Sequence, residues 1–318
     1  MLTYLVILLD DTSVSFCGVP HPKRSRNLIP SDKLRKGIVW AMKENLNIQF
    51  VYPHYRLPDE HREVIEMIDH TKIGPLSCEE ELDVVVLDSP ADIERAAPLP
   101  CIWQCTLSEL SKQLSLVLTF LRKVSRLNIM LTDIAVWGEN ESNTYKTVLN
   151  QLVDGLAAEV GEGEFALPQL NLLTDRLILS KMNNCGAGDS CVTLAPDGRF
   201  YVCPAYYNGE NAGSLDNGLL IPNRQLFQLS HAPICRQCDA WQCKRCVWMN
   251  GKLTGDVNTP SHQQCVAAHL ERNASHRLQQ LLIERGFQMG NCSEFRKIDY
   301  LDPFNIVNKW RQEKLWGE

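Results

Sequence analysis

The sequence predicts an α/β fold in which a parallel sheet is covered by helices on at least one face. Short apolar runs alternate with helical patterns from the start of the chain to about residue 180. These runs are apolar throughout, which is typical of strands that are buried on both faces. The chain has 318 residues, of which 44% are hydrophobic, so it can form a sizeable core. Six strand and helix units suit an open α/β sheet or a partial (β/α) barrel.

Each element follows from a local pattern. The predicted strands are Leu5–Leu9, Ile48–Tyr52, Leu82–Leu87, Cys101–Trp103, Ile129–Leu131 and Leu170–Leu173. The predicted helices are Asp32–Asn45, Pro58–His70, Leu107–Val124, Thr144–Val160 and Val266–Arg285, with a weaker pattern near Asp92. Thr106 and Glu109 form a capping box before the third helix, and Gly286 follows the last one.

Polar residues follow several predicted strands at their carboxyl ends, where ligands collect in α/β folds. They are Asp10, His54, Asp88, Cys105, Asp133 and Asp175. The aspartates equally suit helix caps and turns. No catalytic pair can be chosen from these residues.

Composition and charge restrict the class of partner. The net charge of -6 with mixed signs argues against a protein that coats nucleic acid or an anionic membrane. The opening residues MLTYLVILLDD are apolar but lack a basic flank and a cleavage site, so they predict a buried strand. No other apolar run approaches the length of a membrane span. We therefore expect a cytoplasmic protein.

Cysteine is the most informative residue type in this sequence. Thirteen cysteines are many for a cytosolic chain, and eight of them lie between Cys185 and Cys265. Disulfides rarely persist in the cytosol, and an odd number cannot all be paired. Metal ligation is therefore the leading explanation.

The first three of these cysteines lie in CGAGDSCVTLAPDGRFYVCP, at Cys185, Cys191 and Cys203. Alternating apolar positions on either side of Pro196-Asp197-Gly198 predict a hairpin. A three-residue loop with Gly198 in the left-handed conformation places Cys191 opposite Cys203, whereas a tighter loop shifts the register by one residue. Directly opposed side chains have Cβ atoms roughly 4.5–5.5 Å apart, so both sulfurs could reach one metal group.

Two glycines beside Cys185 allow close approach of the backbone. Gly186 and Gly188 suit an iron–sulfur cluster, whose sulfides accept amide hydrogen bonds, but they also suit an ordinary loop.

The remaining cysteines form a second group, CRQCDAWQCKRC followed by a later cysteine. They are Cys235, Cys238, Cys243, Cys246 and Cys265. Paired CxxC units are a strong metal signal because the short loop brings two thiolates to a common point. Eight thiolates divide into two sets of four, and the spacing alone suits zinc as well as iron–sulfur clusters.

The order of these eight cysteines resembles the SPASM domain of radical SAM peptide maturases, which in its full form carries two auxiliary [4Fe-4S] clusters. The resemblance implies that the first cluster is held by Cys185, Cys191, Cys203 and Cys246. It implies that the second is held by Cys235, Cys238, Cys243 and Cys265. One departure from the pattern is that the gaps on either side of Cys243 are shorter than usual.

The part of the chain before the cysteines resembles a radical SAM barrel without its cluster motif. Radical SAM enzymes carry CxxxCxxC after the first strand, where this chain reads LLDDTSVSFCGVPHP with Cys17 as the only thiol. One cysteine cannot hold that cluster, so no S-adenosylmethionine is expected. The resemblance implies a degenerate radical-SAM-like partial (β/α) barrel in residues 1–180 and a SPASM-type iron–sulfur domain in 181–270, followed by a C-terminal helix and tail in 271–318.

The opening LVILLDDTSVSFCG together with the C-terminal cysteines resembles the CXXX repeat peptide maturase family. That family is associated with ribosomally made, post-translationally modified peptides (RiPPs) that contain cysteine repeats. The resemblance implies two partners, a cysteine-repeat precursor peptide and a radical SAM enzyme whose work this chain assists.

Two other functions are open at this stage. The chain could be an enzyme in its own right, with Cys17, Cys101 and Cys105 at the mouth of the barrel, although Cys101 equally suits the core. It could instead be a structural zinc protein that recognises a peptide.

Several further residues lie near these segments. His21, His54, His262 and His269 are expected on the surface or in the core. Trp241 and Trp248 either shield a cluster from water or simply pack. Phe304, Trp310 and Trp316 in the tail either pack on the body or dock a partner.

Overall fold

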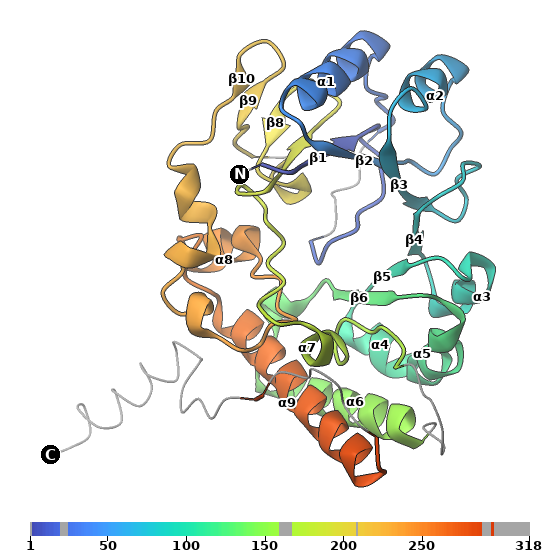
Figure 1. Ribbon diagram of the computed structural model, residues 1–318, viewed down its shortest axis with the longest axis vertical. Coiled ribbons are helices and arrows are strands. Elements are labelled where there is room, and N and C mark those ends of the chain that lie inside the picture. The colour runs from blue at the N-terminus through green and yellow to red at the C-terminus, as the bar shows by residue number, and fades with distance from the viewer. Residues whose placement is uncertain (1, 20–24, 159–166, 208, 288–293, 296–318) are drawn as a thin grey trace, which may run out of the picture. The chain divides into compact units, whose positions relative to one another are not determined.

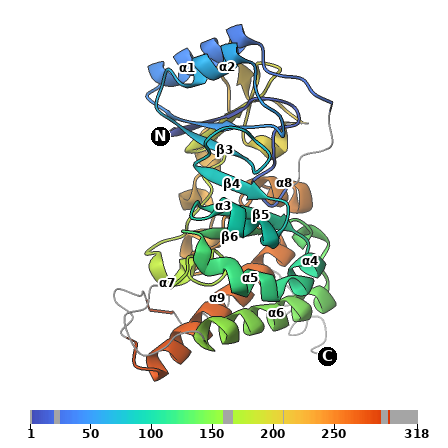
Figure 2. The same cartoon turned by 90° about the vertical axis from the view of Figure 1, so that its right-hand side faces the viewer.

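A computed structural model describes residues 2–19, 25–158, 167–207, 209–287 and 294–295 (Figures 1 and 2). Contacts divide the chain into two compact units. The first contains Met1–Gln104, Phe120–Thr132 and Gly186–Gln228, and the second contains Cys105–Thr119, Asp133–Cys185 and Leu229–Glu318. We describe each unit by itself, and the domain boundaries after residues 180 and 270 stay predictions. His21 and the aromatic residues of the tail lie outside the described residues.

The first unit is built on one eight-stranded sheet in the order β6-β5-β4-β3-β2-β1-β7-β8 (Figure 1). The strands are β1 (Tyr4–Leu8), β2 (Asn47–Val51), β3 (His70–Pro75), β4 (Val84–Leu87), β5 (Cys101–Cys105), β6 (Leu127–Leu131), β7 (Cys191–Leu194) and β8 (Phe200–Tyr201). Neighbouring strands from β1 to β5 pair in parallel, and so do β1 and β7. The α/β class with a mostly parallel sheet is therefore confirmed, and the first six strands follow their order in the chain.

Both faces of β1 are buried, which explains why its sequence is apolar without interruption. Leu5 and Ile7 lie in the cluster that includes residues of α1 (Ser31–Lys43) and α2 (Asp59–Ile65). Val6 belongs to a separate cluster on the opposite face. Successive side chains of a strand point to opposite faces, so a sheet covered on both sides needs an apolar residue at every position.

Two strand predictions were wrong. The structure has a strand at β3 that the sequence did not predict, because HTKIGP begins with polar residues and His70 was the last residue of the predicted helix Pro58–His70. The predicted strand at Leu170–Leu173 is a turn, in which the Leu170 carbonyl accepts hydrogen bonds from the N–H groups of Leu173 and Thr174 at 3.1 and 2.8 Å. Its leucines are all buried, and periodicity alone cannot distinguish a buried turn from a buried strand.

The helices differ from the predictions mainly at their ends. The predicted Leu107–Val124 helix is divided into α4 (Leu107–Lys112), α5 (Leu114–Phe120) and a short 3₁₀ turn, and the capping box of Thr106 and Glu109 is present. The other helices are α3 (Ile93–Ala96), α6 (Glu139–Ala158), α7 (Asp175–Ile178), α8 (Val247–Thr254) and α9 (His262–Glu284). In the second unit α6 and α9 pack side by side (Figure 2). No helix in the described part of the chain has the length and apolar character needed to cross a membrane.

The predicted hairpin forms in the register expected for a three-residue loop. Thr193 faces Tyr201 and Leu194 faces Phe200, and Gly198 has a φ of 84°. The same register, if continued, places Cys191 opposite Cys203, but β8 ends at Tyr201. The hairpin also joins the main sheet, because β7 pairs in parallel with β1. A small sheet of β9 (Gly213–Ser214) and β10 (Gly218–Leu219) follows it.

Candidate metal centre

Four of the eight predicted metal ligands line one small cavity in the second unit. They are Cys235, Cys238, Cys243 and Cys265, which form the second predicted quartet. Cys265 lies in the first turn of α9, which begins earlier than predicted because Ser261 caps it, its hydroxyl accepting a hydrogen bond from the Gln264 N–H at 3.3 Å. The fold thus places Cys235, Cys238 and Cys243, which lie in an irregular segment, next to the start of α9.

Two of these sulfurs each accept a hydrogen bond from a backbone N–H group that is close in the sequence. The N–H of Ala240 donates to Sγ of Cys238, and the N–H of Arg245 donates to Sγ of Cys243, each over 3.4 Å. In both cases the donor is two residues after the cysteine. An amide N–H pointing at sulfur stabilises a thiolate more than a thiol, and hydrogen bonds of this kind tune metal-bound sulfur.

Burial has the opposite effect on the thiols. It raises the pKa of Cys238 to about 11, and it raises the pKa of Cys235 and holds that of Cys243 well above the usual value. Four neighbouring anionic sulfurs are therefore unfavourable in this cavity without a cation. A bound metal ion removes this penalty because it deprotonates a coordinating thiol outright.

The donor type in this cavity fits a thiolate-bound metal group. Among the residues that the structure describes, no three or more His, Cys, Asp or Glu side chains are already arranged to hold a metal ion. The cavity volume is about 20 Å³, which is room for about one water-sized sphere. A single ion suits this volume, whereas a four-iron cluster needs the cysteine side chains to rotate outward.

His269 also lines this cavity and was not predicted to do so. It follows Cys265 by four residues on α9, so both side chains lie on one face of the helix. Its Nε2 atom lies 3.8 Å from Sγ of Cys238. The sequence signal was the spacing of four residues between Cys265 and His269. This spacing indicates a shared helix face only if the helix begins before Cys265, and the predicted helix began at Val266.

The first predicted quartet is divided between the two units. Cys185 and Cys246 belong to the second unit, whereas Cys191 and Cys203 belong to the first. The Cys185 N–H donates to the Lys244 carbonyl at 3.2 Å, so Cys185 lies beside the segment that carries Cys246. Sγ of Cys246 accepts a hydrogen bond from the Met249 N–H at 3.5 Å and caps α8. The shared site of these four residues stays a prediction.

The glycines after Cys185 are explained by loop conformation. Gly186 and Gly188 have φ angles of 72° and 77°. A Cβ on Gly186 would lie 2.0 Å from Oγ of Ser190. The loop itself therefore requires glycine at this position.

Asp239, the residue after Cys238, forms a cluster of ion pairs with two arginines. The Asp239 carboxylate accepts hydrogen bonds from Arg272 at 2.5 and 2.8 Å and lies 3.4 Å from a guanidinium nitrogen of Arg176. Arg176 and Asp239 are fully buried. The Arg176 guanidinium lies over the Trp241 ring at 4.2 Å, so this tryptophan packs against a cation.

The polar residues at the strand ends mostly close turns. Asp10 is buried and accepts hydrogen bonds from Tyr55 and from the N–H groups of Thr12 and Asn27. Asp133 accepts a hydrogen bond from the Leu107 N–H at the start of α4. This agrees with the turn and cap interpretation.

Two of the three cysteines considered for an independent active site are buried thiols whose pKa values are raised. Cys101 and Cys105 are buried, and desolvation raises the pKa of Cys101 to about 12 and that of Cys105 further. Cys17 is half-buried, and its thiol donates to the Val19 carbonyl at 3.5 Å. A thiol reacts as its thiolate, so burial works against catalysis at Cys101 and Cys105.

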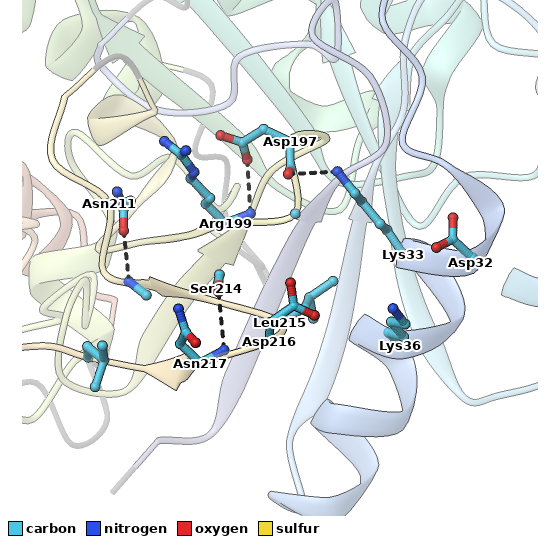
Figure 3. A pocket seen from close by; sticks show the side chains of 13 residues that line it. Asp32, Lys33, Lys36, Asp197, Arg199, Asn211, Ser214, Leu215, Asp216 and Asn217 are labelled. Carbon is cyan, nitrogen blue, oxygen red and sulfur yellow. Dashed lines mark hydrogen bonds between the residues drawn. The ribbon is translucent and has the colours of Figure 1, made fainter.

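The first unit contains a larger cavity of about 500 Å³ (Figure 3). Its walls are polar and come from the start of α1, the β7–β8 loop and the β9–β10 hairpin. The Lys33 ammonium donates to the Asp197 carbonyl at 2.8 Å, and the Arg199 N–H donates to the Asp197 carboxylate at 3.0 Å. Lys36 and Asp216 also line this cavity, so its lining carries both signs of charge.

Comparisons with known proteins give limited information. No protein-family profile matches the sequence, and no curated protein matches it. The fold is similar to that of SuiB from Streptococcus suis, whose crystal structure contains the bound precursor peptide SuiA, with 13% sequence identity and a TM-score of 0.38. The match covers 68% of this chain and 63% of SuiB, which is less than two thirds of that protein. The activity, substrates and partners of this chain are therefore proposals.

Proposed function

We propose that this chain is an iron–sulfur protein of a RiPP modification system, which binds a cysteine-repeat precursor peptide and assists its maturation by a partner radical SAM enzyme. The observation that supports it most is the cavity lined by Cys235, Cys238, Cys243 and Cys265. Four cysteines around one cavity, two from one turn, one from the following loop and one from α9, have a simple physical explanation in metal ligation. The resemblance of all eight cysteines to a SPASM domain favours [4Fe-4S] clusters over zinc.

The proposed ligand sets are the two quartets. Cys235, Cys238, Cys243 and Cys265 would hold one cluster, and Cys185, Cys191, Cys203 and Cys246 would hold the other. When bound, such clusters would transfer electrons, and a peptide thiol would ligate one of them only in place of one of its four cysteines. The chain itself supplies amide N–H groups to two of these sulfurs, and buried side chains such as Met182 and Ala268 line the same cavity.

The peptide has a candidate binding place in the first unit. A cavity of about 500 Å³ is in the range of ligand pockets, and its polar walls suit a polar peptide segment. Lys36 and Arg199 are exposed there and available to a ligand. Replacing both by alanine should weaken binding of the precursor peptide, whereas Lys43→Ala at the far end of α1 should not.

Metal analysis tests the proposal most directly. The chain purified without oxygen, or reconstituted with iron and sulfide, should hold about two [4Fe-4S] clusters and absorb visible light. Cys235→Ser should remove about half of the iron and sulfide. Cys78→Ser, at a half-buried cysteine outside both quartets, should remove none. A colourless preparation that contains only zinc would contradict the iron–sulfur proposal.

The small volume of the cysteine cavity favours a second candidate, a zinc-binding peptide recognition module. About 20 Å³ is closer to the size of one ion than to that of a four-iron cluster, so zinc would need less rearrangement of the cysteine side chains. In that case the chain would bind one or two zinc ions and would still bind the peptide.

The partner role needs a separate experiment. The chain, its precursor peptide and the radical SAM enzyme are co-expressed without oxygen, and the peptide mass is compared with and without this chain. Modification that proceeds equally well without the chain would contradict the assisting role.

A further inference from the structure

One arginine is built into the wall of the cysteine cavity. Arg245 lies between Cys243 and Cys246 in the sequence, is 1% exposed and lines the cavity. Burial of a guanidinium is unfavourable unless hydrogen bonds and a negative charge compensate for the lost water. Its position therefore requires an explanation.

The hydrogen bonds of this guanidinium include two neutral partners. Nε donates to Oδ1 of Asn184 at 3.1 Å, and Nη1 donates to Oδ1 of Asn258 at 3.0 Å. These amides fix the orientation of the side chain and leave its charge in place.

The backbone of Arg245 is fixed in an uncommon conformation. Its φ is 48°, in the left-handed region that residues other than glycine rarely adopt. This conformation accompanies the hydrogen bond from the Arg245 N–H to Sγ of Cys243. One residue thus contributes both an amide and a buried cation to the same cavity.

The surrounding charges match what a thiolate metal centre needs. Four thiolates around a divalent ion, or around a [4Fe-4S]²⁺ core, carry a net charge of −2. Arg176, Arg272 and Asp239 beside Cys238 together carry one net positive charge, and Arg245 adds a second. These positive charges offset part of the negative charge of that centre, while the Glu271 carboxyl, which accepts a hydrogen bond from Gln242 beside Cys243, is an acidic group in the same region.

We propose that Arg245 is the internal counter-cation of the metal centre held by Cys235, Cys238, Cys243 and Cys265, and that it positions Cys243 for binding. This inference rests on the proposed metal function. Arg245 is a positioning residue that acts on the thiolates and does not itself ligate the metal.

The test compares Arg245→Gln with Arg236→Gln in the full chain. Arg236 also lies between two cysteines of the cavity, Cys235 and Cys238, but its side chain is exposed. Glutamine and arginine both have unbranched side chains, so the left-handed φ of this position is similarly unfavourable for both. The substitution therefore removes the charge without changing the backbone strain. Co²⁺ is the probe, because its thiolate charge-transfer absorption reports both binding and ligand type.

Arg245→Gln should weaken Co²⁺ binding by about 10- to 100-fold, as substitutions beside metal ligands do. Arg236→Gln should change it by less than about threefold, and Arg245→Lys should restore part of the affinity. After loading with iron and sulfide, Arg245→Gln should have a more negative reduction potential than Arg236→Gln, since loss of a cation disfavours an added electron.

A second variant keeps the arginine and changes only its charge balance. Asn258→Asp places a carboxylate next to the Arg245 guanidinium and should also weaken Co²⁺ binding. This variant tests the proposal if Arg245→Gln does not fold. Equal Co²⁺ affinities for wild type, Arg245→Gln and Asn258→Asp would overturn the counter-cation role while leaving the metal function intact. A wild-type chain that binds neither Co²⁺ nor iron would overturn both proposals.

Discussion

Nε2 of His269 lies 3.8 Å from Sγ of Cys238, within hydrogen-bonding reach of a sulfur that also accepts the Ala240 N–H. Cys238 therefore has two nitrogen neighbours, one from the backbone and one from α9. A nitrogen that donates to a metal-bound sulfur disperses the negative charge of the thiolate.

This contact predicts that His269→Ala weakens metal binding without changing the number of metal ions bound. The expected loss of Co²⁺ affinity is about tenfold, since a hydrogen bond beside a ligand is removed and the four sulfurs remain. Equilibrium titration with Co²⁺ measures it. His276→Ala, on the same helix but stacked on Phe295, should bind as wild type does. Complete loss of one metal ion in His269→Ala would instead make His269 a ligand.

The ion pairs of Asp239 predict a large loss of stability on Asp239→Asn. The substitution leaves the fully buried Arg176 and the partly buried Arg272 without their carboxylate, which typically costs about 3–5 kcal/mol. Asp154→Asn is the matched control, because Asp154 pairs with Arg277 on the surface and should contribute less than about 1 kcal/mol. Denaturant unfolding of both variants measures the two values. Equal losses of stability in the two variants would contradict a larger contribution from the buried ion pairs of Asp239.

Glu271 predicts a pH dependence of stability. Burial raises its pKa from 4.5 to about 7, although Tyr145 and Gln242 donate hydrogen bonds that lower it. Between these two pH values the unfolded chain releases the proton while the folded chain keeps it. The contribution of Glu271 to the free energy of unfolding is therefore fully present below about pH 4.5. It is lost as the pH rises to about 7, and the total loss is roughly 3 kcal/mol.

Glu271→Gln tests this dependence. The free energy of unfolding of the variant, minus that of wild type, should rise by that amount between about pH 4 and pH 8. A constant difference over this range would mean that Glu271 ionises normally in the folded chain.

Gly213 predicts a backbone effect in the β9–β10 hairpin. Its φ is 108°, and a Cβ there would lie 2.1 Å from the Gly218 carbonyl oxygen. Gly213→Ala should cost about 2–4 kcal/mol, because the atom in the way belongs to the backbone. Gly209→Ala has its nearest neighbour at 3.6 Å and should be close to neutral. Thermal unfolding of the two variants distinguishes these outcomes.

Local patterns predicted the elements that depend on nearby residues. The register of the β7–β8 hairpin followed from Pro196-Asp197-Gly198, because the loop length determines which residues pair. The capping box of Thr106 and Glu109 also involves only neighbours. In contrast, β3 is a strand because β2 and β4 lie on either side of it, and its own sequence has little strand character.

The same distinction holds for the candidate site. The cysteines were predicted from their spacing, since a CxxC pair brings two sulfurs together locally. His269 and Arg245 were missed although each is close to a predicted ligand in the sequence, because the direction of each side chain depends on packing against other segments. Arg245 depends on Asn184 and Asn258, and no pattern near Cys243 identifies either residue.

The parallel pairing of β7 with β1 has a consequence for how the protein is made. The first strand of the chain gains its second neighbour only after about 190 further residues have been synthesised, because β7 begins at Cys191. Until then one side of β1 exposes unpaired backbone groups to other nascent chains, so a fragment that stops before the hairpin should self-associate. The cysteine-rich region thus supplies the strand that protects the earlier-synthesised β1 from aggregation, whether or not metal is present.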